Sequence, residues 1–541
     1  MPVPDRRRPP RRARSSPAGF DRRTSLTARA LVILAALLAA CTPVPSVVER
    51  TPTPTIDRIA RGGTLRVALA TDITTLDPWT ATDADTLAVL AQVYEPLVGL
   101  GPGGLRLVPR LAVRWTSSAD ARVWTFTLRG GVRFHDGTPF DASAVVFDFE
   151  RAGAFAHFDV GALVDTVVAS DPLTVVFTLR EPFAPFAATL ASSAFGMVSP
   201  ACVRQGPAWA TPGSRCAAGT GPFKVDVGGW RPGERVTVTR NLGYWGVDAD
   251  GRRLPFLDGI TFTPVRDESV RVGALKAASI DVALDLGPAS ARPLRSDPNV
   301  MAARSPAFAS LFLGFGVSAK PFDDPGVRRA VAMAIDRGAI VQGAYAGEAR
   351  PATQLLPPGL LGYDDTITQF SPSDAALAKK ALADAGYATG VATDLWYSPD
   401  ATAALPDPKR VAEGIAADLA KIGVTATVRT EDAAAFAADA RAGRLPLWLG
   451  ARDPDRADPD DFMADATTDP IALELLRRAR GETDPSKRGE LYKQVAKLVQ
   501  QSVSRVPLLH AGRLAGLSRK VQGVVVQPVG PSDLGAAWFG S

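Results

Sequence analysis

Apolar residues predict three β-strands in the first third of the chain. Residues 65–69 form a short apolar run, and residues 123–128 and 174–179 alternate apolar and polar side chains with the period of a half-buried strand. Residues 123–128 place two aromatic residues and a leucine on one face. Asp136-Gly137 follows as a turn signal, because glycine adopts the backbone angles that tight turns need.

Three helices are predicted in the second half of the chain. Asp324-Pro325 is an N-cap followed by proline at the first helical position, and this helix is expected to run to about Arg337. A second helix is expected to stop at Gly423, and a third to begin at Asp484-Pro485. The buried stripes of these two helices consist of Val411, Ile415, Leu419 and Ile422, and of Leu491, Val495, Leu498 and Val499. The pattern as a whole predicts a mixed α/β fold.

The first 40 residues have the features of an export signal. An arginine-rich segment precedes the apolar run 30–40, which is too short to span a bilayer and has the length of a signal-peptide core. The run ends in Leu38-Ala39-Ala40-Cys41, which resembles a bacterial lipobox, so we expect 1–40 to be removed and Cys41 to be lipidated. Residues 41–57 are expected to form a flexible tether. Arg22-Arg23 resembles a twin-arginine signal, and both the Sec and Tat routes remain open.

The excess of basic residues in the chain comes from this leader. The whole chain has 61 basic and 56 acidic residues, but residues 1–40 contribute nine arginines and two aspartates, which leaves 52 basic and 54 acidic residues. The body of the protein therefore has no basic surplus to neutralise phosphates, which argues against a nucleic-acid partner. Its 541 residues exceed one compact core and suggest two or three domains.

The three cysteines divide into one expected lipid site and one pair. With Cys41 lipidated, Cys202 and Cys216 remain as an even pair in an oxidising compartment, and we expect a disulfide that closes the loop between them. Two unpaired thiols are the alternative. A metal site is disfavoured here because no other cysteine or histidine lies nearby in sequence.

From residue 62 onward, short segments in consecutive order are similar to the family 5 extracellular solute-binding proteins of bacterial ABC importers. The most extensive is residues 124–140, which read WTFTLRGGVRFHDGTPF. The match spans roughly residues 61–540. Further matching segments are Gly62-Gly63-Thr64-Leu65-Arg66-Val67, Thr75-Leu76-Asp77-Pro78, Val93-Tyr94-Glu95-Pro96-Leu97, Gly219-Thr220-Gly221-Pro222-Phe223, Asn241-Leu242-Gly243-Tyr244-Trp245 and Asp458-Pro459-Asp460-Asp461-Phe462.

The resemblance implies a two-lobed α/β binding protein of the periplasmic type, with an extra domain and hinged lobes that close over a ligand. Lobe I is expected to consist of residues 58–105, 219–311 and 513–541. The extra domain is expected at 106–218, where the disulfide would fasten its last part, and lobe II at 312–512. The chain crossings between the lobes are expected to act as hinges.

No catalytic, metal or cofactor site is expected. His135-Asp136 pairs an imidazole with a carboxylate, but adjacent residues point in different directions and no nucleophile motif accompanies them. The resemblance makes this segment a structural turn. The three histidines, His135, His157 and His510, have no metal-binding spacing.

The acidic stretch 453–461 is the leading ligand-site candidate. In peptide-binding relatives, a carboxylate just upstream of the segment matched here by Asp458-Pro459-Asp460 pairs with the α-ammonium of the peptide, which makes Asp455 the expected partner and Asp453 the alternative. A solvated acidic loop is the plain alternative. Relatives often have a tryptophan where this chain has Gly450-Ala451, and Trp448 lies close enough to be a substitute candidate.

Trp396 and Tyr397, at the end of an expected strand, are candidates for ligand stacking, with core packing as the alternative. The sequence thus predicts a monomeric, lipid-anchored protein on the extracytoplasmic side of the membrane, which binds peptides and delivers them to the permease and ATPase subunits of an ABC importer. A nickel chelate, an oligosaccharide or another small solute is the alternative ligand, and ligand sensing for a receptor is the alternative role. A secreted hydrolase would need a nucleophile and base that the sequence does not contain.

Overall fold

A computed structural model describes residues 59–541, apart from 102, 152–159, 215, 369, 371, 403 and 541. Residues Ile59–Ser541 form one compact unit. The predicted signal peptide, the tether and the lipidation site Cys41 lie outside the described residues.

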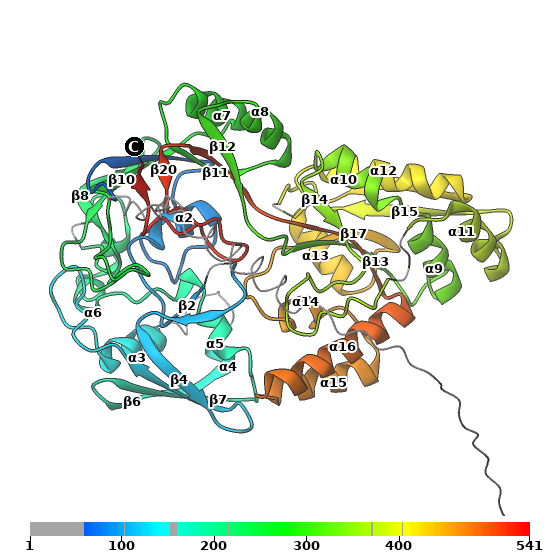
Figure 1. The fold of residues 1–541 in the computed structure, drawn as a ribbon. Coiled ribbons are helices and arrows are strands. Elements are labelled where there is room, and N and C mark those ends of the chain that lie inside the picture. The colour runs from blue at the N-terminus through cyan, green and yellow to red at the C-terminus, as the bar shows by residue number, and fades with distance from the viewer. Residues whose placement is uncertain are drawn as a thin grey trace, which may run out of the picture. The chain divides into compact units, whose positions relative to one another are not determined.

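The first of two large sheets is built from distant parts of the chain (Figure 1). Its central strand β1 (Thr64–Leu69) pairs in parallel with both β10 and β11, and the other pairings are antiparallel. The sheet has seven strands in the order β12 (Val300–Arg304), β19 (Leu514–Ser518), β11 (Val282–Leu286), β1, β10 (Gly259–Pro264), β9 (Arg235–Arg240) and β8 (Phe223–Arg231). The strand predicted at residues 65–69 is confirmed as the centre of this sheet.

Short helices accompany the seven-stranded sheet. Helix α2 (Ala84–Leu90) begins at the N-cap Asp83, whose carboxylate accepts a hydrogen bond from the Thr86 N–H. Helices α7 (Glu268–Lys276) and α8 (Ala291–Arg295) pack beside β11, β12 and β19, and their apolar residues form a small cluster with Leu286 and Leu514. A two-residue pair of strands, β20 (Val521–Gln522) and β21 (Trp538–Phe539), lies near the C-terminus.

A smaller antiparallel sheet of four strands follows the first segment. Its order is β4 (Ala112–Ser117), β5 (Val123–Leu128), β7 (Thr174–Leu179) and β6 (Val164–Asp171). The strands predicted at 123–128 and 174–179 are confirmed with these bounds, and Gly137 adopts the left-handed angle (φ 87°) of the predicted turn. The adjoining elements are β2 (Val98–Leu100), β3 (Leu107–Pro109), α3 (Ala142–Arg151), α4 (Val160–Leu163), α5 (Phe186–Thr189) and α6 (Pro200–Val203).

An aromatic core fixes this four-stranded sheet to its helices. The Phe126 ring packs edge-on against Phe177, with ring centres 5.6 Å apart, and Phe149 of α3 lies 4.8 Å from Phe177. Phe186 of α5 completes the group at 5.3 Å from Phe177. Edge-on aromatic pairs of this kind stabilise a core beyond the area that they bury.

The second large sheet has six strands and carries the longer helices. Its order is β14 (Ala349–Pro351), β18 (Arg505–Ala511), β13 (Ala309–Phe315), β17 (Leu447–Arg452), β15 (Val391–Tyr397) and β16 (Val424–Thr430). The helices of this part are α9 (Pro325–Ala334), α10 (Arg337–Ala344), α11 (Ala375–Leu382), α12 (Pro408–Lys421), α13 (Ala433–Arg441), α14 (Asp460–Met463), α15 (Pro470–Gly481) and α16 (Pro485–Ser502).

Two of the three predicted helices are confirmed. Helix α12 ends at Lys421, just before Gly423 with its left-handed backbone (φ 94°), and buries Val411, Ile415 and Leu419 as predicted. Helix α16 begins after Asp484, whose carboxylate accepts hydrogen bonds from the N–H groups of the first turn. Its stripe is buried except for Leu498, which is half-buried.

The helix predicted to begin at Asp324-Pro325 is wrong at its C-terminal end. Helix α9 begins after Asp324 as predicted but stops at Ala334, because Ile335 is extended (φ −79°, ψ 120°). Asp336 then caps a new helix, α10, by accepting a hydrogen bond from the Ala339 N–H. Asp336 is therefore a second N-cap near the expected end of the predicted helix, and it starts a separate helix.

The chain crosses between the two large sheets through two short links. Residues 305–308 connect β12 to β13, and residues 512–513 connect β18 to β19. Strand β13 pairs with β17 and β18 along its whole length, so the lobe boundary expected at 311–312 falls inside a strand of the second sheet. The first crossing therefore lies a few residues earlier than expected, and the lobe division itself remains our proposal. Within the described part of the chain, no helix combines the length and apolarity needed to cross a membrane.

A disulfide bond joins Cys202 of α6 to Cys216 across 14 residues of sequence. Cys202 is completely buried. Cross-linking a loop of this length restricts the unfolded chain, which stabilises the folded state by about 3 kcal/mol in the chain-entropy model.

We predict that the double variant Cys202→Ser/Cys216→Ser unfolds with a free energy lower by about 3 kcal/mol. Denaturant titration with and without reductant measures this difference. The wild type should lose stability on reduction, and the double variant should not respond to reductant. Equal stability of the oxidised wild type and the double variant would contradict a stabilising bridge.

Candidate functional site

A large cavity lies between the two large sheets, beside both chain crossings. Its volume is about 730 Å³, which is within the usual range of about 300–1,000 Å³ for small-molecule sites. The first sheet and its helices contribute Thr71, Asp85 and Asp285 to the lining, and the second contributes Tyr345 and Asp453. The crossings add Ser305, Gly512 and Arg513. We call this space the inter-sheet cavity.

Six acidic residues line the inter-sheet cavity: Asp85, Glu268, Asp285, Glu348, Asp407 and Asp453. Asp85 accepts hydrogen bonds from the Thr71 N–H (2.6 Å) and hydroxyl (2.8 Å), which leaves it tied to its own sheet. Asp285 is exposed at a bulge of β11, in the left-handed backbone region (φ 46°) that non-glycine residues rarely occupy. Its negative charge raises the pKa of Asp453, which places the two carboxylates within electrostatic range of each other.

Asp453 follows β17 directly and belongs to the second sheet. Its carboxylate accepts a hydrogen bond from the Ala404 N–H at 3.4 Å. Burial raises the pKa of Asp453, and the positive charge of Arg513 opposes this shift. A partly desolvated carboxylate of this kind forms strong charge-assisted hydrogen bonds with a cationic group.

Basic groups line other parts of the same cavity. Arg304 forms an ion pair with Glu348 (2.7 Å), and Arg295 pairs with the same carboxylate, so two arginines of the first sheet region hold a glutamate of the second. Arg513 donates to the Gly530 carbonyl at 2.7 Å. Arg410 at the start of α12 is exposed, and its guanidinium has no recorded partner among the described residues. The inter-sheet cavity therefore offers groups of both charges.

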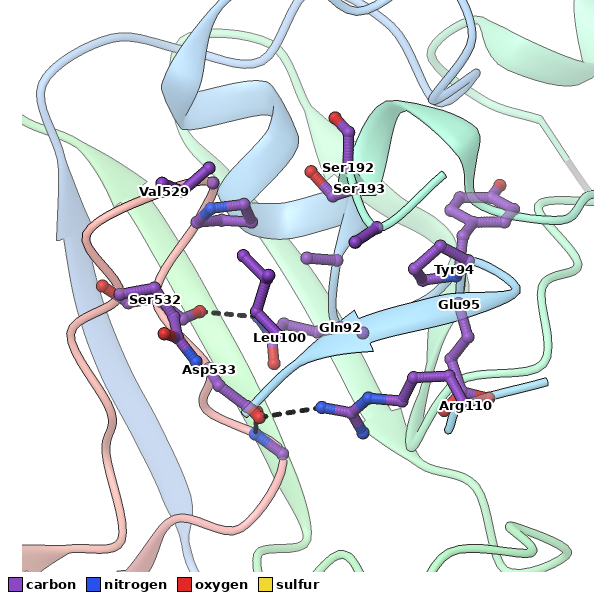
Figure 2. A pocket seen from close by; sticks show the side chains of 18 of the residues that line it. Gln92, Tyr94, Glu95, Leu100, Arg110, Ser192, Ser193, Val529, Ser532 and Asp533 are labelled. Carbon is purple, nitrogen blue, oxygen red and sulfur yellow. Dashed lines mark hydrogen bonds and ion pairs between the residues drawn. The ribbon is translucent and has the colours of Figure 1, made fainter. Parts of the chain in front are cut away.

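The second cavity is smaller, about 140 Å³, and Figure 2 shows its lining. Residues 91–100, Arg110, residues 188–193 and the C-terminal segment 527–536 contribute most of its wall. Asp455, Arg456 and Ala457 of the second large sheet's region complete it. We call it the side cavity.

A buried glutamate lies behind the side cavity and gathers three separate segments. Glu95 accepts hydrogen bonds from the Tyr244 hydroxyl (2.7 Å), the Trp245 indole N–H (2.9 Å) and the Thr220 hydroxyl (3.0 Å). Burial raises the pKa of Glu95, while the charge of Arg110 and these three donors oppose the shift. The three segments that meet at Glu95 are among those that resemble the family 5 proteins. Segments that are separate in the sequence therefore share one group of hydrogen bonds in the structure.

Arg110 connects this group to the C-terminal segment. Its guanidinium pairs with Asp533 at 3.2 Å, as the dashed line in Figure 2 shows. Burial lowers the pKa of Arg110, but the charge of Asp533 more than compensates, and the pKa lies above its usual value. The wall of the side cavity is therefore fixed by hydrogen bonds and an ion pair.

The two expected carboxylates lie in different cavities. Asp453 lines the inter-sheet cavity, and Asp455, only two residues further on, lines the side cavity. Asp455 is exposed, and its backbone N–H donates to Asp461 at 2.8 Å. The sequence identified the correct loop for a cavity wall but did not indicate that its carboxylates face two separate spaces.

The three aromatic candidates line neither cavity. Tyr397 is buried in the core of the second sheet, with 8% of its surface exposed, and Trp396 is half-buried on β15. Trp448 packs edge-on against Phe312, with ring centres 5.5 Å apart, and Arg505 lies over its ring. Tyr397 and Trp448 therefore contribute to packing in this structure.

Several cavity residues carried no sequence signal. Asp285 lies in a bulge, Tyr345 ends a helix and Arg513 lies in a crossing, and none of these is part of a recognisable motif. The positive φ angle of Asp285 depends on tertiary structure and has no composition signal.

His135 has a structural role. The Gly219 N–H donates to its Nδ1 (3.3 Å), so its Nε2 carries the proton and donates to the Gly221 carbonyl (3.0 Å). Both ring nitrogens are thereby used to hold the Gly219–Gly221 segment against the turn. Asp136 lies near the sulfur atoms of Cys202 and Cys216, but their disulfide bond takes both thiols out of any metal-ligand set.

Together, the two sheets, the two short crossings and the charged cavity between them define a two-lobed, periplasmic-type solute-binding protein. The chain matches the family model "Bacterial extracellular solute-binding proteins, family 5 Middle" over residues 106–471. It is 30% identical over 490 residues to the glutathione-binding protein GsiB of Escherichia coli K12, which covers 85% of this chain and 92% of the relative.

Solved structures are similar over nearly the whole described chain. HbpA2 from Haemophilus parasuis superposes with a TM-score of 0.80 at 28% identity, covering 88% of this chain and all of that one. DppA from Helicobacter pylori, in complex with the peptide STSA, superposes with a TM-score of 0.70 at 25% identity, covering 89% and 99%. The protein belongs to the family 5 extracellular solute-binding proteins, which serve ABC importers.

We predict that His135 stays neutral across physiological pH. Burial lowers its pKa to about 4. Because this value lies below the unfolded value of about 6.5, the unfolded chain takes up the proton first as the pH falls. The contribution of His135 to stability is therefore complete above pH ~6.5 and is lost as the pH falls toward 4.

Proton NMR titration of the imidazole signals tests this prediction. The His135 signal, assigned by its absence in His135→Gln, should stay constant from about pH 8 to pH 6 and move only below about pH 5. A midpoint near 6.5 would show that the imidazole is solvated and free to act as an acid or base.

Proposed function

We propose that the protein binds a short peptide in the inter-sheet cavity and delivers it to the permease of an ABC importer. The observation that carries this proposal is the composition of the cavity: about 730 Å³ of space lined by both carboxylates and guanidiniums. Such a lining is complementary to a zwitterion. The names of two similar proteins, a glutathione-binding protein and a periplasmic binding protein in complex with the peptide STSA, support a peptide-like ligand.

Asp453 is the proposed partner of the peptide's α-ammonium. Its carboxylate is partly buried, lines the larger cavity and is already oriented by the Ala404 N–H. Asp455 was the first expectation from the sequence, but it is exposed and faces the side cavity. Arg410, whose guanidinium is exposed at the cavity, is the proposed partner for the peptide carboxylate.

Closure of the two sheets over the ligand is the proposed transport signal. Only the short links 305–308 and 512–513 join the sheets, and a few residues of this kind are enough to absorb a hinge motion. The Glu348 pair with Arg295 and Arg304 spans the two sheet regions at the cavity wall and would stabilise the closed state. The protein carries out no chemistry on the ligand in this proposal, and it works as a monomer.

A nickel chelate, an oligosaccharide or another small solute is the competing ligand class on the same scaffold. Mass spectrometry of the ligand that co-purifies under gentle conditions separates these possibilities. A co-purified peptide supports the proposal, and a sugar or metal chelate would overturn it.

We predict that Asp453→Asn weakens binding of peptides with a free N-terminus about 10- to 100-fold, because a hydrogen bond to a charged group contributes about 1.5–3 kcal/mol. Isothermal titration calorimetry with Ala-Ala-Ala and its N-acetylated form measures this. The acetylated peptide should bind both proteins equally weakly, since it has no ammonium to lose.

Asp455→Asn is the matched control, because it removes the same charge two residues away. It should leave Ala-Ala-Ala binding nearly unchanged. A large loss in Asp455→Asn with none in Asp453→Asn would assign the ammonium to the side cavity and contradict the proposal.

Membrane attachment through Cys41 is also a proposal, supported by the lipobox-like segment and the Pro/Thr-rich stretch that follows it. A diacylated cysteine supplies the two chains that stable anchoring needs. The tether would let the binding unit reach a permease from the membrane surface.

We predict that the wild type fractionates with membranes and incorporates labelled palmitate, whereas Cys41→Ser appears in the soluble extracytoplasmic fraction without label. Cys216→Ser, which also replaces one cysteine, should remain at the membrane. Membrane association of Cys41→Ser would show that another feature holds the protein there.

A further inference from the structure

The side cavity contains two buried polar atoms whose hydrogen-bonding capacity is unused. The Ser193 hydroxyl and the Gln527 side-chain carbonyl have no hydrogen-bond partner among the described residues, and each residue has only 8% of its surface exposed. Both residues line the side cavity, and Figure 2 shows Ser193 beside Leu100 and Val529 around this space. Buried polar groups nearly always have partners, so an unpaired hydroxyl and an unpaired amide carbonyl in one cavity point to a missing polar group, and both can accept from a donor.

The carboxylate of Asp455 is a third acceptor in the side cavity. Five carboxylate and guanidinium side chains line the side cavity: Glu95, Asp455 and Asp533 are acidic, and Arg110 and Arg456 are basic. Glu95 is satisfied by three donors, Asp533 pairs with Arg110, and Arg456 pairs with Asp461 at 3.2 Å. The Asp455 carboxylate has no recorded partner among the described residues. One uncompensated negative charge thus remains in the lining.

Much of the remaining wall is apolar and the space is small. Leu100, Val529, Ala188 and Ala191 line it, and its volume of about 140 Å³ is close to the ~150 Å³ of an engineered protein cavity that accepts benzene. A group of about five or six non-hydrogen atoms fits. Its stem would contact apolar side chains while its end meets acceptors, which is how lysine-like side chains are usually buried.

The side cavity is also close to the inter-sheet cavity. Asp453 and Asp455 line one cavity each and are separated by a single residue. Two residues of extended chain span at most about 7 Å, so the Cα atoms of Asp453 and Asp455 lie no more than about 7 Å apart.

We propose that the side cavity accepts one side chain of the bound peptide and favours a side chain that ends in an amino group. Asp455 binds the ammonium, and Ser193 and Gln527 accept hydrogen bonds from it. The inference rests on the proposed function, because it concerns the selectivity of the same bound peptide.

Calorimetry with matched tripeptides tests the proposal. Lysine and its uncharged analogue norleucine are placed in turn at each position of Ala-Ala-Ala, so that each pair differs at the terminal amino group. In the wild type, lysine at one position should bind about 10-fold more tightly than norleucine there. Asp455→Asn should reduce this preference to near 1, and Ser193→Ala should reduce it several-fold.

Both variants are expected to fold. Asp455 is exposed, and Ser193→Ala removes a hydroxyl that forms no hydrogen bond in the structure, so the melting temperature should not fall. Asp453→Asn is the contrasting variant: it should weaken the lysine and norleucine peptides equally and leave their ratio unchanged.

The outcomes separate this inference from the proposed function. Binding of Ala-Ala-Ala that depends on Asp453, without any lysine preference in the wild type, would overturn the side-chain assignment alone. A lysine preference that survives Asp455→Asn would overturn it as well. Absence of binding by every peptide would overturn the proposed function and this inference with it.

Discussion

The buried carboxylate of Glu95 is the contact on which the arrangement of the side cavity depends. An unpaired buried charge costs several kcal/mol, so this group is compatible with folding only when Tyr244, Trp245 and Thr220 all reach it. Satisfying it brings together the segment after α2, the segment before β8 and the loop after β9. The neighbouring Arg110–Asp533 pair then attaches the C-terminal segment, which closes the side cavity.

The loop after β17 shows how one short segment can serve two spaces. Pro454 separates two carboxylates, and the surrounding structure gives each a different environment: partly desolvated at the inter-sheet cavity for Asp453, exposed at the side cavity for Asp455. In a ligand that occupies both cavities, Asp453 would bind the backbone ammonium and Asp455 would bind a side chain. Selectivity would then depend on closure, since the two cavities draw residues from both large sheets.

Local signals in the sequence were sufficient for single elements and insufficient for the site. The strands at 123–128 and 174–179 and the capped helix at Asp484 were predictable, because alternation and capping act within a few residues. Asp336 was missed as an N-cap because a short apolar pattern continues past it. The sequence does not show whether Tyr397 and Trp448 lie in the core or contact a ligand, because an aromatic residue at a strand end is equally suited to both positions.

A crystal structure of the protein with bound Ala-Ala-Ala is the most direct test of peptide recognition in the inter-sheet cavity. The peptide should lie between the two large sheets, with its α-ammonium about 2.7–3.2 Å from the Asp453 carboxylate. Electron density for the peptide outside the inter-sheet cavity, or an ammonium paired with Asp455 and not with Asp453, would contradict this assignment.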